Sequence, residues 1–144
     1  MLDDIYNTKI LEFAGNIPLL GHIDNPQAQA KAHSRLCGST VSVEVCVANG
    51  LITSFAQDVK ACALGQASAS ILGQHVIGAT PAEVREAYAQ LHAMLKDNGP
   101  VPTGRFADLS FLEPVRDYKA RHASTMLAFE ALVKALDDVE AAVA

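Results

Sequence analysis

The sequence predicts an α+β domain in which a small antiparallel sheet of about three strands is covered by helices. Two β-type runs, residues 40–48 and 51–59, flank the dipeptide Asn49-Gly50. Asn-Gly between apolar-rich runs is the strongest short signal for a two-residue hairpin, because both turn positions need a positive φ. Segments with helical periodicity precede and follow this hairpin. At 144 residues, the chain is long enough for one domain, residues 1–144, with a proper core.

The chain before the hairpin predicts one helix and one strand. Residues 3–14 place their apolar side chains on a roughly helical face, and Asp3 and Asp4 in the first turn favour the helix dipole. The Gly-Asn-Ile-Pro run at residues 15–18 ends this helix. Residues 28–36 are compatible with a helix or a strand. We predict a strand, because a lone two-stranded hairpin is only marginally stable.

The hairpin turn predicts a register. With a two-residue loop at Asn49-Gly50, residues that face each other have numbers adding up to 99, so Cys37 and Cys62 would meet at the open end, on one face of the ribbon. The alternating valines of the first strand predict one buried face. Their partners in this register are only half apolar. A bulge in the second strand would shift the pairing by one residue.

Four helical segments are predicted after the hairpin. Residues 62–74 are rich in Ala, Ser and Gly, so a helix there could approach a neighbouring backbone closely. Thr80 as N-cap, Pro81 at N1 and Glu83 at N3 open a helix that reaches about Lys96. The connection 101–114 predicts a short helix at residues 106–112. The last element, residues 118–143, is a long amphipathic helix by its apolar spacing.

Composition excludes several classes of function. The formal charge is −5, the pI is about 5.4 and no Lys/Arg-rich run is present, so neither nucleic acid nor an anionic membrane is an expected partner. No apolar run reaches the length of a membrane span, and the acidic N-terminus is unlike a secretory signal. Three cysteines, an odd number, do not suggest a disulfide framework, and the cytoplasm is therefore the expected compartment.

The cysteines are the best candidates for chemistry. Cys62 lies where strand gives way to helix, and there the free N–H groups of the first turn and Lys60 would stabilise a thiolate. Cys37 precedes Gly38, which can adopt backbone conformations closed to other residues. A single free cysteine is most often a buried small hydrophobe, but two that face each other favour function. Cys46 lies mid-strand on the opposite face from the valines, and a structural role is predicted for it.

Other chemistry-bearing side chains are sparse. His122 and Ser124 lie near the start of the last helix, where an imidazole could reach the open end of the hairpin as a ligand for zinc or iron. A histidine beside Lys119 and Arg121 is, by itself, more often solvated. The other histidines show no ligand spacing. The sequence contains no phosphate-binding or dinucleotide-binding glycine loop, no nucleophile elbow and no acid–base pair of carboxylates.

Four segments together resemble a known family. These are Leu36-Cys37-Gly38-Ser39, the Asn49-Gly50 hairpin, the run from Ala61-Cys62 through Ser70 and Arg121-His122-Ala123-Ser124. They are similar to the iron–sulfur cluster assembly scaffolds IscU, SufU and the NifU N-terminal domain, over nearly the whole chain. The resemblance implies a small antiparallel sheet with helices packed on it. It also implies three cysteines that hold a nascent cluster or zinc, one of them receiving sulfur from a cysteine desulfurase.

The sequence departs from the family pattern at two of these positions. Ser39 stands where the family has the aspartate of Cys-Gly-Asp, and the third cysteine falls at Ala123 or Ser124, depending on a one-residue alignment choice. His122 corresponds to the histidine that commonly precedes that cysteine in IscU. The implied ligands are therefore Cys37, Cys62 and His122, with Ser39 and Ser124 as weaker oxygen donors. The chaperone-docking segment of IscU has only Glu-Pro-Val-Arg here, at residues 113–116.

Three functions follow from the resemblance. The first is a non-enzymatic scaffold that transiently holds iron and sulfide, or a metal ion, on Cys37, Cys62 and His122 and passes the cluster to apo-proteins or carrier proteins. The second is a SufU-like, zinc-dependent sulfur acceptor with sulfurtransferase activity, in which Cys37 or Cys62 carries a persulfide. The third is a degenerate, metal-free member of the family that binds partners.

Overall fold

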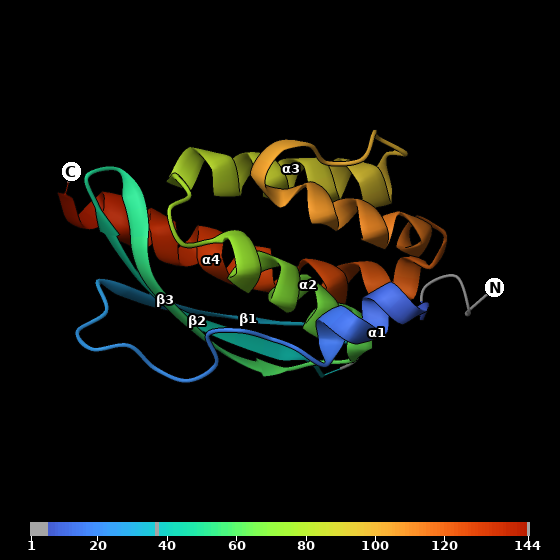
Figure 1. Cartoon of the computed structure of the whole chain (residues 1–144), viewed down its shortest axis with the longest axis horizontal. Coiled ribbons are helices and arrows are strands. Elements are labelled where there is room, and N and C mark those ends of the chain that lie inside the picture. Colours follow the sequence, from blue (N-terminus) through green and yellow to red (C-terminus); the bar gives the residue numbers. More distant parts are fainter. Residues whose placement is uncertain (1–5, 37, 144) are drawn as a thin grey trace.

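The computed structural model describes residues 6–36 and 38–143, and it confirms the α+β class. A three-stranded antiparallel sheet forms one side of the molecule and the helices cover its other side (Figure 1). In chain order the elements are α1 (Thr8–Ala14), β1 (Ala28–His33), β2 (Thr40–Ala48), β3 (Leu51–Lys60), α2 (Ala63–His75), α3 (Pro81–Lys96), the 3-10 segments η2 (Gly104–Asp117) and η3 (Lys119–Arg121), and α4 (His122–Val143).

The hairpin of β2 and β3 turns at Asn49-Gly50, and both residues have positive φ, as the sequence predicts. Pairing starts in the predicted register, with Ala48 opposite Leu51, and shifts by one residue at Cys46/Val47. Below this bulge, paired residue numbers add up to 100. Val41, Val43 and Val45 consequently face Val59, Gln57 and Phe55 rather than the half-apolar set of the unshifted register.

The predicted strand before the hairpin is confirmed as β1, although it ends at His33 instead of residue 36. It pairs antiparallel with β2, and the sheet order is β1-β2-β3. Its alanines Ala28 and Ala32 face inward and are buried, whereas Gln29, Lys31 and His33 are exposed. Small side chains on this inner face leave room for a helix to lie close to the strand.

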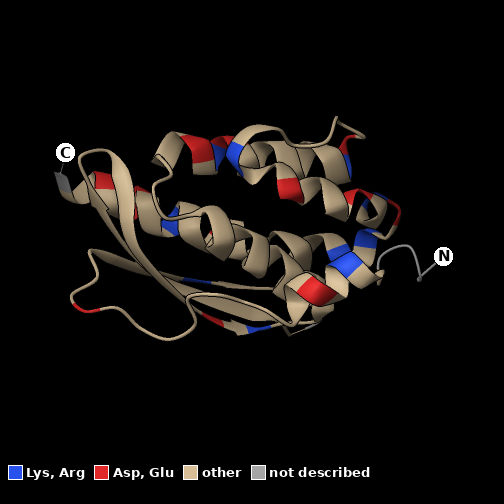
Figure 2. Ribbon diagram, viewed as in Figure 1, with Lys and Arg blue, Asp and Glu red and all other residues tan. Residues whose placement is uncertain are grey.

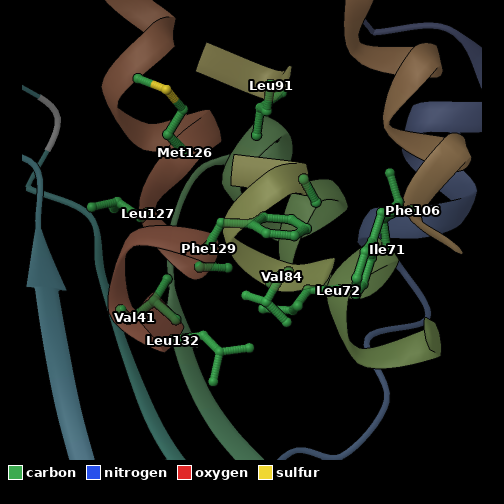
Figure 3. Close-up of a cluster of buried hydrophobic side chains, with 14 of the residues drawn as sticks. Val41, Ile71, Leu72, Val84, Leu91, Phe106, Met126, Leu127, Phe129 and Leu132 are labelled. Atoms are coloured by element: carbon green, nitrogen blue, oxygen red, sulfur yellow. The ribbon is translucent and has the colours of Figure 1, made fainter. Parts of the chain in front are cut away.

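Helix α4 occupies that room and is the centre of the core. It packs on β1, β2, α2 and α3, and its buried side chains meet those of α2, α3 and η2 (Figure 3). Phe129 of α4 contacts Phe106 of η2 edge to face, with ring centroids 5.5 Å apart. Helix α2 carries no Lys, Arg, Asp or Glu, in keeping with its burial between other elements (Figure 2).

The helix boundaries follow local signals in most places. Helix α3 begins with the predicted capping box, because Thr80 Oγ1 accepts from Glu83 N and Glu83 Oε1 accepts from Thr80 N. Helix α1 begins at Thr8, with the Asn7 side chain as its cap, and therefore later than predicted. Asp3 and Asp4 lie outside the described residues.

The two C-terminal predictions need correction. The short helix predicted at residues 106–112 is part of a longer 3-10 stretch, Gly104–Asp117, which is broken by non-helical φ and ψ at Phe106. The last α-helix starts at His122 rather than residue 118, after the 3-10 turn Lys119–Arg121. Among the described residues, no helix is both long and apolar enough to cross a bilayer.

Residues 19–27 form a strap that the sequence did not reveal. Leu20 makes a parallel bridge to Gln57 at the edge of β3, and the chain then crosses the outer face of the sheet to reach β1. Glu44 of β2 holds this strap, accepting from Ile23 N at 3.0 Å and contacting His22 Nδ1 at 2.6 Å. The outer face of the sheet is thus partly covered by the chain's own N-terminal segment.

Candidate functional site

The candidate site lies where β3 gives way to α2. Strand β3 ends at Lys60, and Cys62 is the N-cap residue of α2, with an extended backbone (φ −68°, ψ 172°). Gln66 fixes this junction, because its Nε2 donates to Ala61 O at 2.9 Å and its backbone N donates to Cys62 O at 2.9 Å. The Cys62 side chain makes no capping hydrogen bond, and its sulfur is therefore not engaged by the first turn of its own helix.

The Cys62 thiol faces the start of α4 instead. Its Sγ lies 3.2 Å from Oγ of Ser124, which is buried in the first turn of α4. Cys62 is half-buried, so the sulfur sits at the boundary between core and solvent. The fold thereby brings together two residues that are 62 positions apart in the chain, from two of the sequence segments that pointed to function.

A glycine makes this approach possible. A Cβ built on Gly65 would lie 2.7 Å from Ala61 Cβ and 3.1 Å from Ser124 O, both closer than ordinary van der Waals contact. Gly65 is buried in the first turn of α2, so its missing side chain allows the first turns of α2 and α4 to touch. The predicted close approach of the small-residue helix is seen here, at the point where Cys62 and Ser124 meet.

Ser39 belongs to the same end of the hairpin. It directly precedes Thr40, which pairs with Lys60, two residues before Cys62. Ser39 is buried, and its carbonyl accepts from Ser34 N at 2.9 Å, which closes a tight loop in which Gly38 has a φ of 70°. Cys37 lies outside the described residues. The register that predicted it directly opposite Cys62 is wrong below the bulge, where paired residue numbers add up to 100. A meeting of the two thiols remains a prediction.

His122 is buried and held by the chain around it. Its Nε2 lies 3.0 Å from Val115 O and 3.0 Å from Arg116 O, so this nitrogen carries the proton and donates to one or both carbonyls. The side chains of His122 and Ser124 leave the first turn of α4 about 200° apart, since each helical residue rotates by about 100°. The fold therefore directs Ser124 towards Cys62 and His122 towards η2.

Cys46 lies on the outer face of the sheet, as predicted. Its Sγ lies 3.5 Å from Asn25 O, in the strap, within the range of a weak S–H donor. A structural role in holding the strap agrees with this contact. Among the described residues, no group of three or more His, Cys, Asp and Glu side chains could hold a metal ion.

Sequence reasoning missed the residues that position the site. Gln66 fixes the junction of β3 and α2 through its hydrogen bonds, and Gly65 allows the close approach of α2 and α4. A signal was present for Gly65, because glycine in a helix interior is unfavourable and so indicates a close contact. Gln66 carried no comparable signal, because glutamine is an ordinary helix residue.

The chain matches a known family and a solved structure over nearly its whole length. The family described as NifU-like N terminal domain matches residues 5–125. The crystal structure of a nitrogen-fixing NifU-like protein (N-terminal) from Brucella abortus is 55% identical, covers 97% of both chains and superposes with a TM-score of 0.96.

Two more distant proteins extend the comparison. The iron–sulfur cluster assembly scaffold protein IscU of Thermotoga maritima is 22% identical over 135 residues, which is 94% of each chain. The SUF-system scaffold candidate FiSufU from Fervidobacterium islandicum AW-1 has the same fold, with a TM-score of 0.85 at 21% identity over 93% of this chain and 98% of its own. The resemblance seen in the sequence is confirmed, and the chain belongs to the NifU-like N-terminal domain family of iron–sulfur cluster assembly scaffolds.

Proposed function

We propose that this chain transiently binds iron and sulfide, or a metal ion, at the open end of the hairpin and passes the assembled cluster to apo-proteins. Cys37 and Cys62 are the thiolate ligands in this proposal, and Ser124, Ser39 and His122 are the candidate additional donors. The iron–sulfur cluster is cargo that the protein receives and releases. The protein itself catalyses no reaction under this proposal.

The contact between Cys62 Sγ and Ser124 Oγ carries the proposal. In the family pattern a third cysteine falls at Ala123 or Ser124. Ala123 is exposed, whereas Ser124 is buried against Cys62. The geometry therefore favours Ser124 as the counterpart of that cysteine. A serine oxygen then occupies the place of a sulfur at the site.

A serine in place of the third cysteine would weaken the binding of the cluster or metal ion. Neutral hydroxyls are poorer ligands for iron or zinc than thiolate or imidazole. His122 could supply a better donor, but its Nε2 would first have to leave the carbonyls of Val115 and Arg116. A scaffold must release what it binds, so weak ligation is compatible with the proposed role.

The proposed partners follow from this role. A cysteine desulfurase would supply sulfur to the thiols, and apo iron–sulfur proteins or carrier proteins would accept the cluster. Cys62 is half-buried, which would let a partner's side chain reach its sulfur while the buried side chains of α2 stay covered.

Anaerobic reconstitution with ferrous iron and sulfide tests the proposal. We expect the wild-type chain to develop the visible absorption of a protein-bound cluster, and we expect Cys62→Ala and Cys37→Ala to lose it. Cys46→Ala is the matched control, because it removes a half-buried thiol on the outer face of the sheet. A wild-type chain that stays colourless, or a Cys62→Ala variant that colours normally, would refute the proposal.

A second candidate function is supported by the Cys62 sulfur, which is half-buried and forms no disulfide. Cys62 is the N-cap residue of α2, and its side chain makes no capping hydrogen bond. A thiolate there could attack the outer sulfur of a desulfurase persulfide, so that Cys62 gains one sulfur and the desulfurase cysteine leaves as a thiolate. Mass spectrometry after incubation with a desulfurase and cysteine would show the added sulfur, and Cys62→Ser should lack it if Cys62 is the acceptor.

A further inference from the structure

A pocket on the other side of the first turn of α4 shares His122, but none of the cysteines, with the proposed cluster site. It has a volume of about 630 Å³ and lies between the end of α3, lined by Leu95, Lys96 and Asn98, and the segment that leads into α4, lined by Arg116 and Lys119 among others. This volume is in the range of small-molecule sites.

The charge of this pocket is opposite to that of the whole chain. Lys96, Arg116 and Lys119 line it, against one carboxylate, that of Asp117. Glu113 pairs with Arg116 at 3.1 Å, and its side chain is half-exposed. A positive, concave surface on a protein with a formal charge of −5 is not what composition alone would give. Such a surface concentrates small anions.

Arg116 holds a hydrogen-bond donor that the protein leaves unused. Its Nε is buried and has no partner within the described residues, whereas its Nη2 pairs with Glu113 Oε2 at 3.1 Å and lies 3.4 Å from Gly99 O. Unpaired buried donors are rare, and a bound ion or water is a usual reason for one. Because Nε is covered in this structure, an anion would reach it together with a rotation of the guanidinium group.

His122 forms part of the wall of the pocket. It lines the pocket, only 3% of its surface is exposed, and its Nε2 contacts the backbone carbonyls of Val115 and Arg116. These contacts fix the chain that presents the Arg116 side chain. His122 is therefore a positioning residue for the pocket.

We propose that this pocket binds a small oxyanion, a phosphoryl or carboxylate group, between Lys96, Lys119 and Arg116. The planar guanidinium matches the two oxygens of such a group, and the two ammonium groups add charge from either side. The proposal can be tested apart from cluster binding, because the oxyanion would be held by Lys96, Lys119 and Arg116 and by none of the thiols. It assigns a ligand to the face of α4 that points away from Cys62.

NMR titration of the full chain with inorganic phosphate, and separately with acetate, tests this proposal. Sodium chloride at matched ionic strength is the reference in both titrations. We expect saturable shifts of amides near the end of α3 and in residues 116–122. Saturation by phosphate alone identifies a phosphoryl ligand, saturation by acetate alone a carboxylate ligand, and saturation by both the shared oxyanion chemistry.

The double variant Lys96→Gln/Lys119→Gln should weaken binding by about tenfold, because it removes two charged donors. Both lysines are exposed, so the fold should be retained, and circular dichroism checks this. Lys134→Gln, an exposed lysine further along α4, is the control and should bind as the wild type does. Shifts that grow linearly, that match those in sodium chloride, or that persist unchanged in the double variant would overturn the proposal.

Discussion

Gly65 and Ser124 lie so close that a Cβ on Gly65 would come within 3.1 Å of the Ser124 carbonyl oxygen. This backbone contact sets the distance between the first turns of α2 and α4. The 3.2 Å separation of Cys62 Sγ and Ser124 Oγ depends on it.

Replacing Gly65 by alanine should therefore destabilise the protein. In an unobstructed helix the change from glycine to alanine stabilises by about 1 kcal/mol. Here the added methyl group meets Ala61 and the Ser124 backbone, and overpacking of this kind costs about 1–3 kcal/mol. Urea denaturation measures the difference. Gln74→Ala, at an exposed position of the same helix, should change stability little, and a Gly65→Ala variant more stable than the wild type would contradict the packing argument.

Ser124→Cys should restore a third thiol beside Cys62 and tighten metal binding. A soft thiolate would replace a neutral hydroxyl, and we expect zinc affinity to rise on the order of tenfold or more. Competition with a chromophoric chelator measures the affinity. Ala123→Cys is the matched control, because it adds a thiol one residue earlier at an exposed position. An equal gain in both variants would show that the position next to Cys62 is not special.

Thr80→Ala should lower the free energy of unfolding by about 1 kcal/mol, since it removes one half of the capping box of α3. Thermal or urea denaturation measures the loss. Thr103 is a useful comparison, because it is the N-cap of η2 but makes no capping hydrogen bond through its side chain. Thr103→Ala should therefore cost much less, and equal losses in the two variants would argue against a capping role for Thr80.

The contact between His22 and Glu44 predicts a pH dependence of stability. The hydrogen bond to Glu44 raises the pKa of His22 above its ordinary value of 6.5, and the hydrogen bond from His22 lowers the pKa of Glu44 below its ordinary value of 4.5. The stabilisation from His22 is complete below pH 6.5 and is lost as pH rises through the higher folded pKa. That from Glu44 is complete above pH 4.5 and is lost as pH falls through the lower folded pKa.

The stability difference between the wild type and Glu44→Gln should therefore be largest between pH 4.5 and 6.5 and should shrink on either side. Urea denaturation across pH measures this difference, and NMR titration of the His22 ring should give a lower pKa in the variant. Asp24→Asn removes an equal charge from the same strap and should leave the pH profile of stability unchanged. An unaltered His22 pKa in Glu44→Gln would refute the pairing.

The parts of the fold that local signals dictate could be predicted from the sequence. Asn49-Gly50 predicts the hairpin, because the turn needs two residues with positive φ. Thr80 and Glu83 predict the start of α3, because the capping box uses only neighbouring groups. The valine alternation likewise gave the buried face of β2. Each of these features is decided within a few residues of chain.

The rest depends on contacts between distant segments. The bulge at Cys46/Val47 replaces a half-apolar pairing with one in which Phe55 and Val59 face the core, and only the packing of helices on that face selects it. In the site, the sequence placed Cys62 and Ser124 in two candidate segments, but it could not say that Ser124 points at the sulfur. That depends on where α4 starts, and the 3-10 turn before His122 sets this start.

The strap has a consequence for how copies of this protein behave at high concentration. Its residues Leu19 and Gly21 hydrogen-bond to the backbone N–H and C=O of Gln57. Part of the free edge of β3 is therefore already paired with the strap. Among the described residues the other edge of the sheet is β1, which has six residues and carries Lys31, a side chain that discourages strand addition. Within residues 6–36 and 38–143, the sheet consequently offers no long, uncharged edge on which a neighbour could build a fibril.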